Sequence, residues 1–277
     1  IDTPVSESAC TGAAVGASLA GMKPIVVHPR MDFMLYAIDP IVNTAAKWHS
    51  MTGGQSSPGV TIRAIINRGG EQGAQHSQAL QSWFAHIPGL RVLIPYSVQD
   101  ARDMLIASVL SNDPVIYIDD RWLYNNEEYI EPIKEIEIER ITPKCISKGD
   151  DLTIVASGYS THLAIQLKSL LRENKDINSD VIDLRVLNPF DSYEIIRSVN
   201  KTGRLLVLDG GWSTCGISSE VITSTLENIS PRKLLSSPKR ITLPPSPAPS
   251  SRKLEEIYYP KLDKIFNETV NWIELNK

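Results

Sequence analysis

Short runs of apolar residues alternate with helical patterns along the whole chain. Strand-length runs separated by helix-length amphipathic segments are typical of βαβ units and parallel sheets. In the first half, this pattern predicts strands near Ile25–His28, Val60–Asn67, Val92–Pro95 and Pro114–Asp119. It places helices near Ser8–Ala20, Phe33–His49, Ser77–His86 and Val98–Val109. The first half is therefore predicted to form an α/β domain.

The second half repeats the same alternation. Its predicted strands are Leu152–Ser157, Val181–Val186, Leu205–Asp209 and Arg240–Leu243. The predicted helices are Thr161–Arg172, Ser192–Val199, Ile217–Leu226 and a final amphipathic helix at Lys261–Leu275. The fold class is therefore α/β, with two parallel-sheet domains.

The segment between the two halves is polar and is predicted to be an extended connector. It runs over Asn125–Gly149, and the alternation of Glu and Ile at 135–139 predicts an extended segment with one side exposed to solvent. The predicted domains are therefore residues 1–124 and 150–277, joined by a linker at 125–149. The Ser236–Ser251 segment carries five prolines and is predicted to be a structural strap over the surface, with a flexible docking loop as the alternative.

Composition excludes several classes of protein. The 277 residues suffice for two α/β cores. The net charge is -4, and the sequence contains no basic run of the kind that nucleic-acid binding needs. No apolar stretch reaches the roughly 18 residues of a membrane helix, so no membrane partner is expected. The three cysteines are far apart and form no Cys-x-x-Cys pair, which favours reduced thiols.

The first predicted helix is unusually rich in small residues, which allows close approach to a neighbouring segment. Ser6 is a candidate N-cap, and Gly21 followed by Pro24 predicts the end of the helix. Glu7 falls in the first turn. Local reasoning favours a carboxylate that complements the helix dipole, and a functional role would need a specific partner.

A second candidate is the glycine-rich turn at Asn67–Gln78, which connects a predicted strand to a predicted helix. Such turns approach ligands closely at the carboxyl ends of parallel strands. His76 is expected at the start of the helix, where an imidazole can transfer a proton or bind an anion. A surface histidine that caps the helix is an equal alternative.

Collinear segments over nearly the whole chain resemble the beta subunit of pyruvate and branched-chain 2-oxoacid dehydrogenases, within the transketolase-like superfamily. The segments are Asp2–Glu7, Ala20-Gly21, Ala37–Asp39, Asn43–Lys47, Met51–Gln55, Gly73–Gln78, Pro88–Leu90, Asp113–Val115, Asp183–Arg185 and Gly210–Trp212. The resemblance implies a transketolase-like pyrimidine-binding domain followed by a transketolase C-terminal domain. It also implies a further helix and strand before Ile1, which are missing here.

The resemblance assigns roles to particular residues. Glu7 is implied to hydrogen-bond N1′ of the aminopyrimidine of thiamine diphosphate, which favours the imino tautomer that deprotonates C2 of the thiazolium. Phe33 and Val5 are implied to pack on that ring. His76 is implied to lie near the substrate and the lipoyl arm. A potassium ion is implied at backbone carbonyls of Val60, Ser108, Val109, Ser111 and Asp113.

The same resemblance implies partners. The diphosphate and magnesium are held by a Gly-Asp-Gly…Asn motif on an alpha subunit, and this chain has no such motif. An obligate α2β2 heterotetramer is therefore expected, with a small 2-oxoacid as substrate and a lipoyl acyltransferase core as acyl acceptor. The expected location is the bacterial cytoplasm, with the mitochondrial matrix as alternative.

Two segments depart from the family pattern and leave the substrate open. Val27–Phe33 brings Arg30 and Asp32 towards the expected pocket mouth, and Arg63–Arg68 lacks a Gly-Pro turn and adds Arg68. An anionic or bulkier acyl group is thus an open alternative to a small one. The sequence also leaves open a transketolase or deoxyxylulose-phosphate synthase type of enzyme, an acetoin-cleaving dehydrogenase, and a catalytically silent structural subunit.

Overall fold

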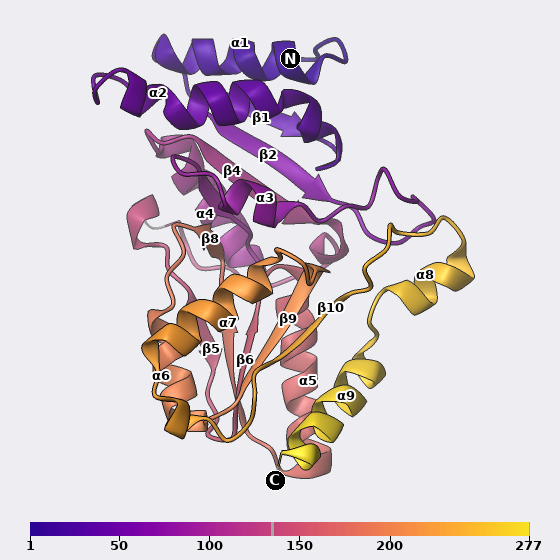
Figure 1. The fold of residues 1–277 in the computed structure, drawn as a ribbon. Coiled ribbons are helices and arrows are strands. Elements are labelled where there is room, and N and C mark those ends of the chain that lie inside the picture. The colour runs from indigo at the N-terminus through magenta and orange to yellow at the C-terminus, as the bar shows by residue number, and fades with distance from the viewer. Residues whose placement is uncertain (134–135, 277) are drawn as a thin grey trace. The chain divides into compact units, whose positions relative to one another are not determined.

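The computed structural model describes residues 1–133 and 136–276, which form two compact units. Unit 1 comprises Ile1–Ile141 and Val186–Pro189, and unit 2 comprises Thr142–Arg185 and Phe190–Lys277. Each unit is built around a five-stranded sheet that is mostly parallel (Figure 1). No helix in the described part of the chain is both long and apolar enough to cross a bilayer.

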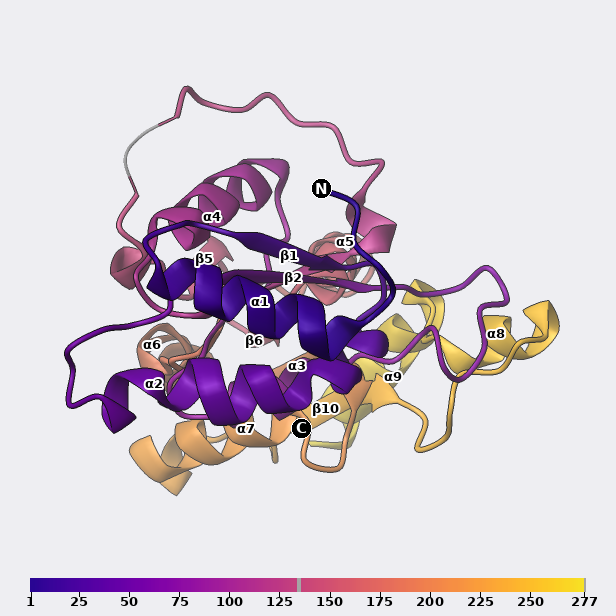
Figure 2. The same ribbon diagram turned by 90° about the horizontal axis from the view of Figure 1, so that it is seen from above.

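Unit 1 has the strand order β1-β2-β4-β3-β8. The strands are β1 (Ile25–His28), β2 (Thr61–Ile66), β3 (Arg91–Leu93), β4 (Val115–Asp120) and β8 (Val186–Asn188). The α-helices are α1 (Glu7–Leu19), α2 (Ala46–Met51), α3 (Gln81–Ala85) and α4 (Val98–Leu110). The short helices are η1 (Phe33–Ala37), η2 (Asp39–Ala45), η3 (Arg121–Leu123) and η4 (Ile138–Arg140). Seen from above, α1 lies on one side of β1 and β2, and α4 lies on the other (Figure 2).

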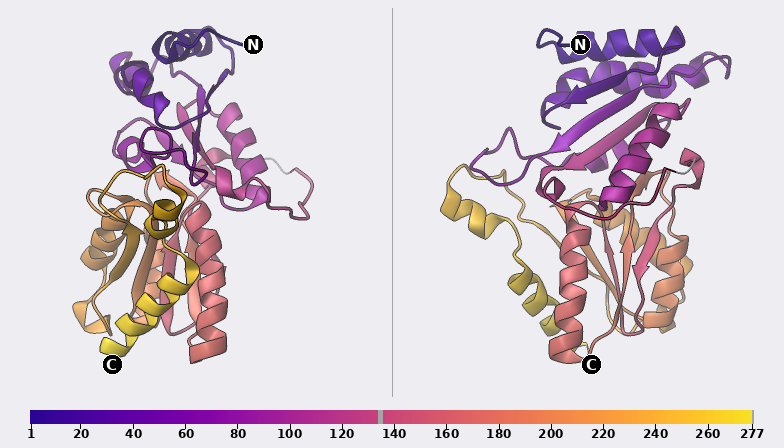
Figure 3. Two further views of the ribbon diagram at one scale, coloured as in Figure 1. Left: turned by 90° about the vertical axis from the view of Figure 1, so that its right-hand side faces the viewer. Right: turned by 180° about the vertical axis from the view of Figure 1, so that it is seen from behind.

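Unit 2 has the strand order β10-β9-β6-β7-β5. The strands are β5 (Lys144–Ser147), β6 (Leu152–Ala156), β7 (Ser179–Asp183), β9 (Leu205–Trp212) and β10 (Lys239–Leu243). The helices are α5 (Tyr159–Lys175), α6 (Tyr193–Thr202), α7 (Ile217–Asn228), η5 (Pro231–Lys233), α8 (Arg252–Tyr258) and α9 (Leu262–Leu275). Helices α5 and α9 cover one face of the sheet and α6 and α7 the other (Figure 3).

The α/β class is confirmed, but neither sheet is wholly parallel. In unit 1, β8 pairs antiparallel with β3, and in unit 2, β5 pairs antiparallel with β7. Both are edge strands that follow irregular chain or another strand directly. An antiparallel neighbour needs no helical crossover, which explains why the helix-strand alternation did not predict these two strands.

The polar segment at 125–149 contributes to both units. Ile138 and Ile141 are buried against Met104, Tyr117 and Val186 in the core of unit 1. Lys144–Ser147 then forms the edge strand of the unit 2 sheet. Part of the Glu-Ile alternation, at residues 134–135, lies outside the described residues.

Two helices differ from the sequence prediction. The segment from Phe33 to His49 is a 3-10 turn, then a π-helical stretch containing Pro40, and only then α-helix from Ala46. Pro40 has no N–H to donate, which is compatible with this break in the regular ladder. Helix α3 begins at Gln81 rather than at Ser77.

The proline-rich segment of unit 2 acts as a strap. The Tyr258 hydroxyl and the Trp212 indole N–H both donate to the carbonyl of Ser246, at 2.9 and 3.1 Å. Ala248, within the strap, belongs to the same small apolar cluster as Tyr258 and Tyr259. These contacts support the prediction of a structural strap.

Candidate active site

The candidate site lies at one edge of the unit 1 sheet. Strands β1, β2 and β4 are mutually parallel, so the segments that follow them emerge at the same carboxyl edge. Open α/β sheets bind ligands at this edge. Helix α1 reaches the same edge: Glu7, in its first turn, acts electrostatically on His28, the last residue of β1, and Thr11 Oγ1, one turn further along, lies 3.2 Å from the His28 imidazole.

Glu7 is half-buried in the first turn of α1 and lies close enough to His28 to act on it electrostatically. Burial lowers the pKa of His28, and the negative charge of Glu7 partly opposes this shift. The fold thus favours a neutral imidazole beside the carboxyl group. The Ser6 side chain makes no capping hydrogen bond, contrary to the sequence prediction, whereas Gly21, at φ +91°, follows the end of the helix as expected.

Phe33 and His76 are brought into direct contact. Their ring centroids lie 5.2 Å apart with the planes at 84°, an edge-to-face arrangement. Phe33 begins η1, after β1, and His76 lies in the loop after β2. Two of the expected site residues, far apart in the sequence, therefore meet at the carboxyl edge.

His76 does not start a helix, and the reason is a tertiary hydrogen bond. The N–H of Gln78 donates to Oδ1 of Asp32 at 3.2 Å, so it is taken up by another segment and not by a helical turn. Upstream, Gly69, Gly70, Glu71 and Gly73 all have positive φ, which keeps the chain irregular.

Asp32, which the sequence placed only towards the expected pocket mouth, is buried beside the candidate site, and the sequence did not indicate this burial. It is only 6% exposed, and its Oδ2 has no hydrogen-bond partner. Burial raises the pKa of this carboxyl, while the hydrogen bond from Gln78 and the charge of His76 oppose the rise. The available signal was an aspartate beside Phe33 at the end of an apolar run.

Val5 is almost fully exposed, at 95%, so this chain covers very little of its side chain. It precedes α1 by two residues and is on the same segment as Glu7. Its position leaves its apolar surface available to a ligand or a partner chain.

A hollow of about 380 Å³ opens at the same edge between the loop after β2 and the turn after β4. Arg68 pairs with Asp120 at 3.0 Å, with both side chains buried, and Trp122 covers Gly69 so closely that a Cβ there would lie 3.1 Å from the indole. The hollow is lined by Asn67, Arg68, Gly69, Gly70, Gln72, Arg121, Trp122 and Asn125. Glu7, Phe33 and His76 are not among its lining residues.

The positions expected to hold potassium lie where α4 ends and β2 begins. Ser108 and Val109 are in the last turns of α4, and Ser111 follows the helix. The carbonyl of Ser111 accepts a hydrogen bond from the ammonium of Lys23 at 2.6 Å. In the described chain, no group of three or more His, Cys, Asp or Glu side chains is arranged to hold a metal ion.

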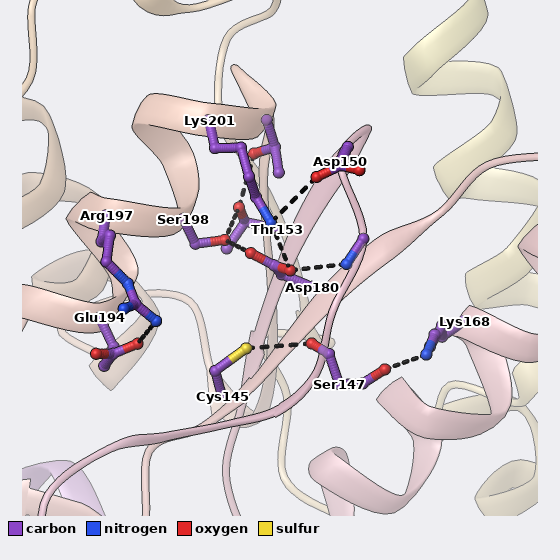
Figure 4. Close-up of polar contacts among 12 residues, drawn as sticks. Cys145, Ser147, Asp150, Thr153, Lys168, Asp180, Glu194, Arg197, Ser198 and Lys201 are labelled. Carbon is purple, nitrogen blue, oxygen red and sulfur yellow. Dashed lines mark hydrogen bonds and ion pairs between the residues drawn. The ribbon is translucent and has the colours of Figure 1, made fainter.

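Unit 2 contains a separate polar cluster around Asp180, which is 3% exposed (Figure 4). Its carboxylate accepts hydrogen bonds from Ser198 Oγ at 2.5 Å, Lys201 Nζ at 2.9 Å and the Gly149 N–H at 2.8 Å. These contacts tie β7 to α6 and to the turn before β6. Both carboxylate oxygens of Asp180 are paired, and the role of the cluster is structural.

Two family descriptions match this chain. "Transketolase, pyrimidine binding domain" matches residues 1–126, and "Transketolase, C-terminal domain" matches residues 143–265. The beta subunit of acetoin:2,6-dichlorophenolindophenol oxidoreductase from Cupriavidus necator is 36% identical over 96% of this chain and 78% of its own length. The mitochondrial pyruvate dehydrogenase E1 component subunit beta of Saccharomyces cerevisiae is 33% identical over 94% of this chain and 72% of its own.

This chain belongs to the transketolase-like family of dehydrogenase beta subunits. Solved structures agree on the fold of this beta-subunit family. A split-gene transketolase, described as an inactive beta4 tetramer, matches with a TM-score of 0.79 at 20% sequence identity. The match covers 100% of this chain and 84% of the transketolase chain. A transketolase variant from Pichia stipitis has a TM-score of 0.69 at 16% identity, over 97% of this chain and 37% of its own.

Proposed function

We propose that this chain is the beta subunit of a 2-oxoacid dehydrogenase that decarboxylates its substrate on thiamine diphosphate and transfers the acyl group to lipoamide. The observation that carries the proposal is the gathering of Glu7, Phe33 and His76, from three segments, at the carboxyl edge of the unit 1 sheet. Curated relatives named as pyruvate and acetoin dehydrogenase beta subunits, matched over most of the chain, support it.

Glu7 would hold a proton at N1′ of the aminopyrimidine. Its place in the first turn of α1 suits this task, because the turn lies at the ligand-binding edge and is only partly covered by this chain. His28 beside it is held towards the neutral form, so it does not compete as a fixed cation for the carboxylate. Thiamine diphosphate, when bound, supplies the carbon nucleophile and electron sink that decarboxylation needs.

Phe33 and Val5 would cover the aminopyrimidine and exclude water from the Glu7 hydrogen bond, which strengthens it. His76, held against Phe33, would face the substrate and the lipoyl arm. There it can donate a hydrogen bond or a proton as the acyl group is transferred. Asp32, buried under the same pair of segments, would orient this part of the site.

The rest of the cofactor site would come from an alpha subunit in an α2β2 heterotetramer. That subunit would hold the diphosphate and magnesium, and a lipoyl acyltransferase core would accept the acyl group. The exposed apolar side chain of Val5 is consistent with a site that a partner completes. The proposed location is the bacterial cytoplasm, with the mitochondrial matrix as alternative, since similar beta subunits come from bacteria and from mitochondria.

A second candidate is cleavage of acetoin, favoured by the names of two beta subunits that are 36% and 34% identical to this chain. The test is a substrate panel for the purified α–β complex with 2,6-dichlorophenolindophenol as electron acceptor. We expect 2-oxoacid oxidation that needs both subunits, thiamine diphosphate and magnesium. If the complex oxidises acetoin and no 2-oxoacid, the second candidate is established. Turnover by the isolated chain would contradict the proposal that the site is shared with an alpha subunit.

A further inference from the structure

The end of α4 is a place where a positive charge is stabilising. A helix leaves its last carbonyl groups without backbone donors, and they form the negative end of the helix dipole. Helix α4 ends at Leu110, and Ser111 continues with an extended backbone. The family resemblance implies a potassium ion here, so the contacts of these carbonyls decide whether an ion is needed.

The ammonium of Lys23 already lies at this position. Nζ donates to the Ser111 carbonyl at 2.6 Å and to the side-chain oxygen of Asn112 at 3.0 Å. Lys23 lies between α1 and β1, and the next residue anchors the segment, because the Pro24 carbonyl accepts the Thr61 N–H at 3.1 Å. The charge is therefore delivered to the helix end by a short, tethered segment.

Gly59 lies beside this contact, and its lack of a side chain leaves the space that the Lys23 ammonium occupies. A Cβ at Gly59 would lie 2.7 Å from the Ser111 carbonyl oxygen and 2.8 Å from Lys23 Nζ. Any larger residue at 59 would therefore displace the ammonium, the carbonyl or both. Of the other carbonyls implied to hold potassium, that of Val60 already accepts the Val115 N–H at 2.9 Å.

We propose that the Lys23 ammonium takes the place of the bound monovalent cation at the end of α4. The chain then carries its own cation, and its stability does not depend on potassium. An ammonium suits the position because, like potassium, it carries a single positive charge, and it already contacts the Ser111 carbonyl and the Asn112 side-chain oxygen. The proposal concerns the fold of unit 1 and is independent of the reaction proposed above.

The test measures thermal unfolding of the full-length protein in potassium, sodium and choline chloride at equal ionic strength. We expect the wild-type Tm to be the same in all three salts. Lys23→Met should lower the Tm by roughly 2–4 °C in sodium and choline, and potassium should restore it in a saturable way. Lys253→Met, at an exposed lysine of α8, is the matched control and should respond to no salt.

Two results would overturn the proposal. One is a potassium-specific rise in the Tm of the wild-type protein, which would mean that a potassium ion binds despite Lys23. The other is a Lys23→Met protein that potassium does not rescue, which would mean that the end of α4 is not a cation site.

Discussion

The rings of Phe33 and His76 lie edge to face, with centroids 5.2 Å apart and planes at 84°. Tyr36 stacks on the same phenyl ring with centroids 6.4 Å apart, but its side chain is 71% exposed. Phe33 contacts the imidazole of His76 directly, whereas Tyr36 contacts Phe33, so Phe33 is the aromatic residue placed to fix the orientation of His76. An aromatic pair of this geometry contributes about 0.5–1.5 kcal/mol beyond the area it buries.

Phe33→Leu and His76→Gln should therefore be coupled in their effects on acyl transfer to lipoamide. We expect the double variant to lose less than the sum of the two single losses, by about 0.5–1.5 kcal/mol in transition-state free energy. Single-turnover rates of the reconstituted complex give this number. Tyr36→Leu is the control and should show no coupling with His76→Gln. Additive losses for Phe33 and His76 would contradict the role assigned to the pair.

Asp32→Asn should change how stability depends on pH. The folded state raises the pKa of Asp32 above its ordinary value of 3.8, so the folded protein binds this proton more tightly than the unfolded chain. Stability associated with the protonated carboxyl is then lost as pH rises from 3.8 through the raised value. The Asn side chain carries no charge at any of these pH values. The free energy of unfolding of the variant should therefore rise relative to that of the wild type over this pH window, and the difference should persist at neutral pH.

Urea unfolding at a series of pH values measures this difference. Asp39→Asn, at an exposed carboxylate, provides the control and should give no such trend. A constant offset between Asp32→Asn and the wild type at every pH would show that Asp32 is not titrating in the folded state as described.

Unit 2 allows a comparison between a buried carboxylate, Asp180, and an accessible ion pair, that of Glu194 with Arg197 (Figure 4). Asp180→Ala removes the acceptor of the buried Ser198 hydroxyl and Gly149 N–H, whereas Lys201, which is 42% exposed, keeps its ion pair with Asp150. The variant should therefore lose about 1–3 kcal/mol in the free energy of unfolding. Glu194→Ala removes only the accessible pair with Arg197, at 2.6 Å, and should cost less than about 1 kcal/mol. Urea unfolding compares the two variants, and equal losses would argue against the structural role of the cluster.

Much of the fold could be predicted because local patterns determine it. The apolar run at Ile25–His28 is the strand β1 with the predicted bounds, and the amphipathic pattern at Lys261–Leu275 is the helix α9 from Leu262. Predictions failed where distant residues decide the structure. Helix α3 starts late because Gln78 bonds to Asp32, 46 positions away.

The same limit applies to the site. Glu7 and His76 were found through their family motifs, since a carboxylate in a first helical turn and a histidine in a glycine-rich loop are each ambiguous alone. The proximity of Glu7 to His28, and the burial of Asp32, arise only when α1, β1 and the loop after β2 assemble. No spacing within the sequence encodes these contacts.

The most direct test of the central claim is the rate of hydrogen–deuterium exchange at C2 of thiamine diphosphate in the reconstituted α–β complex. Glu7→Gln should slow this exchange by about 10²–10⁴-fold while the complex still assembles, and Glu227→Gln, at an exposed glutamate of α7, should leave it unchanged. Exchange in Glu7→Gln at the wild-type rate would contradict the assignment of Glu7 as the acid that activates the cofactor.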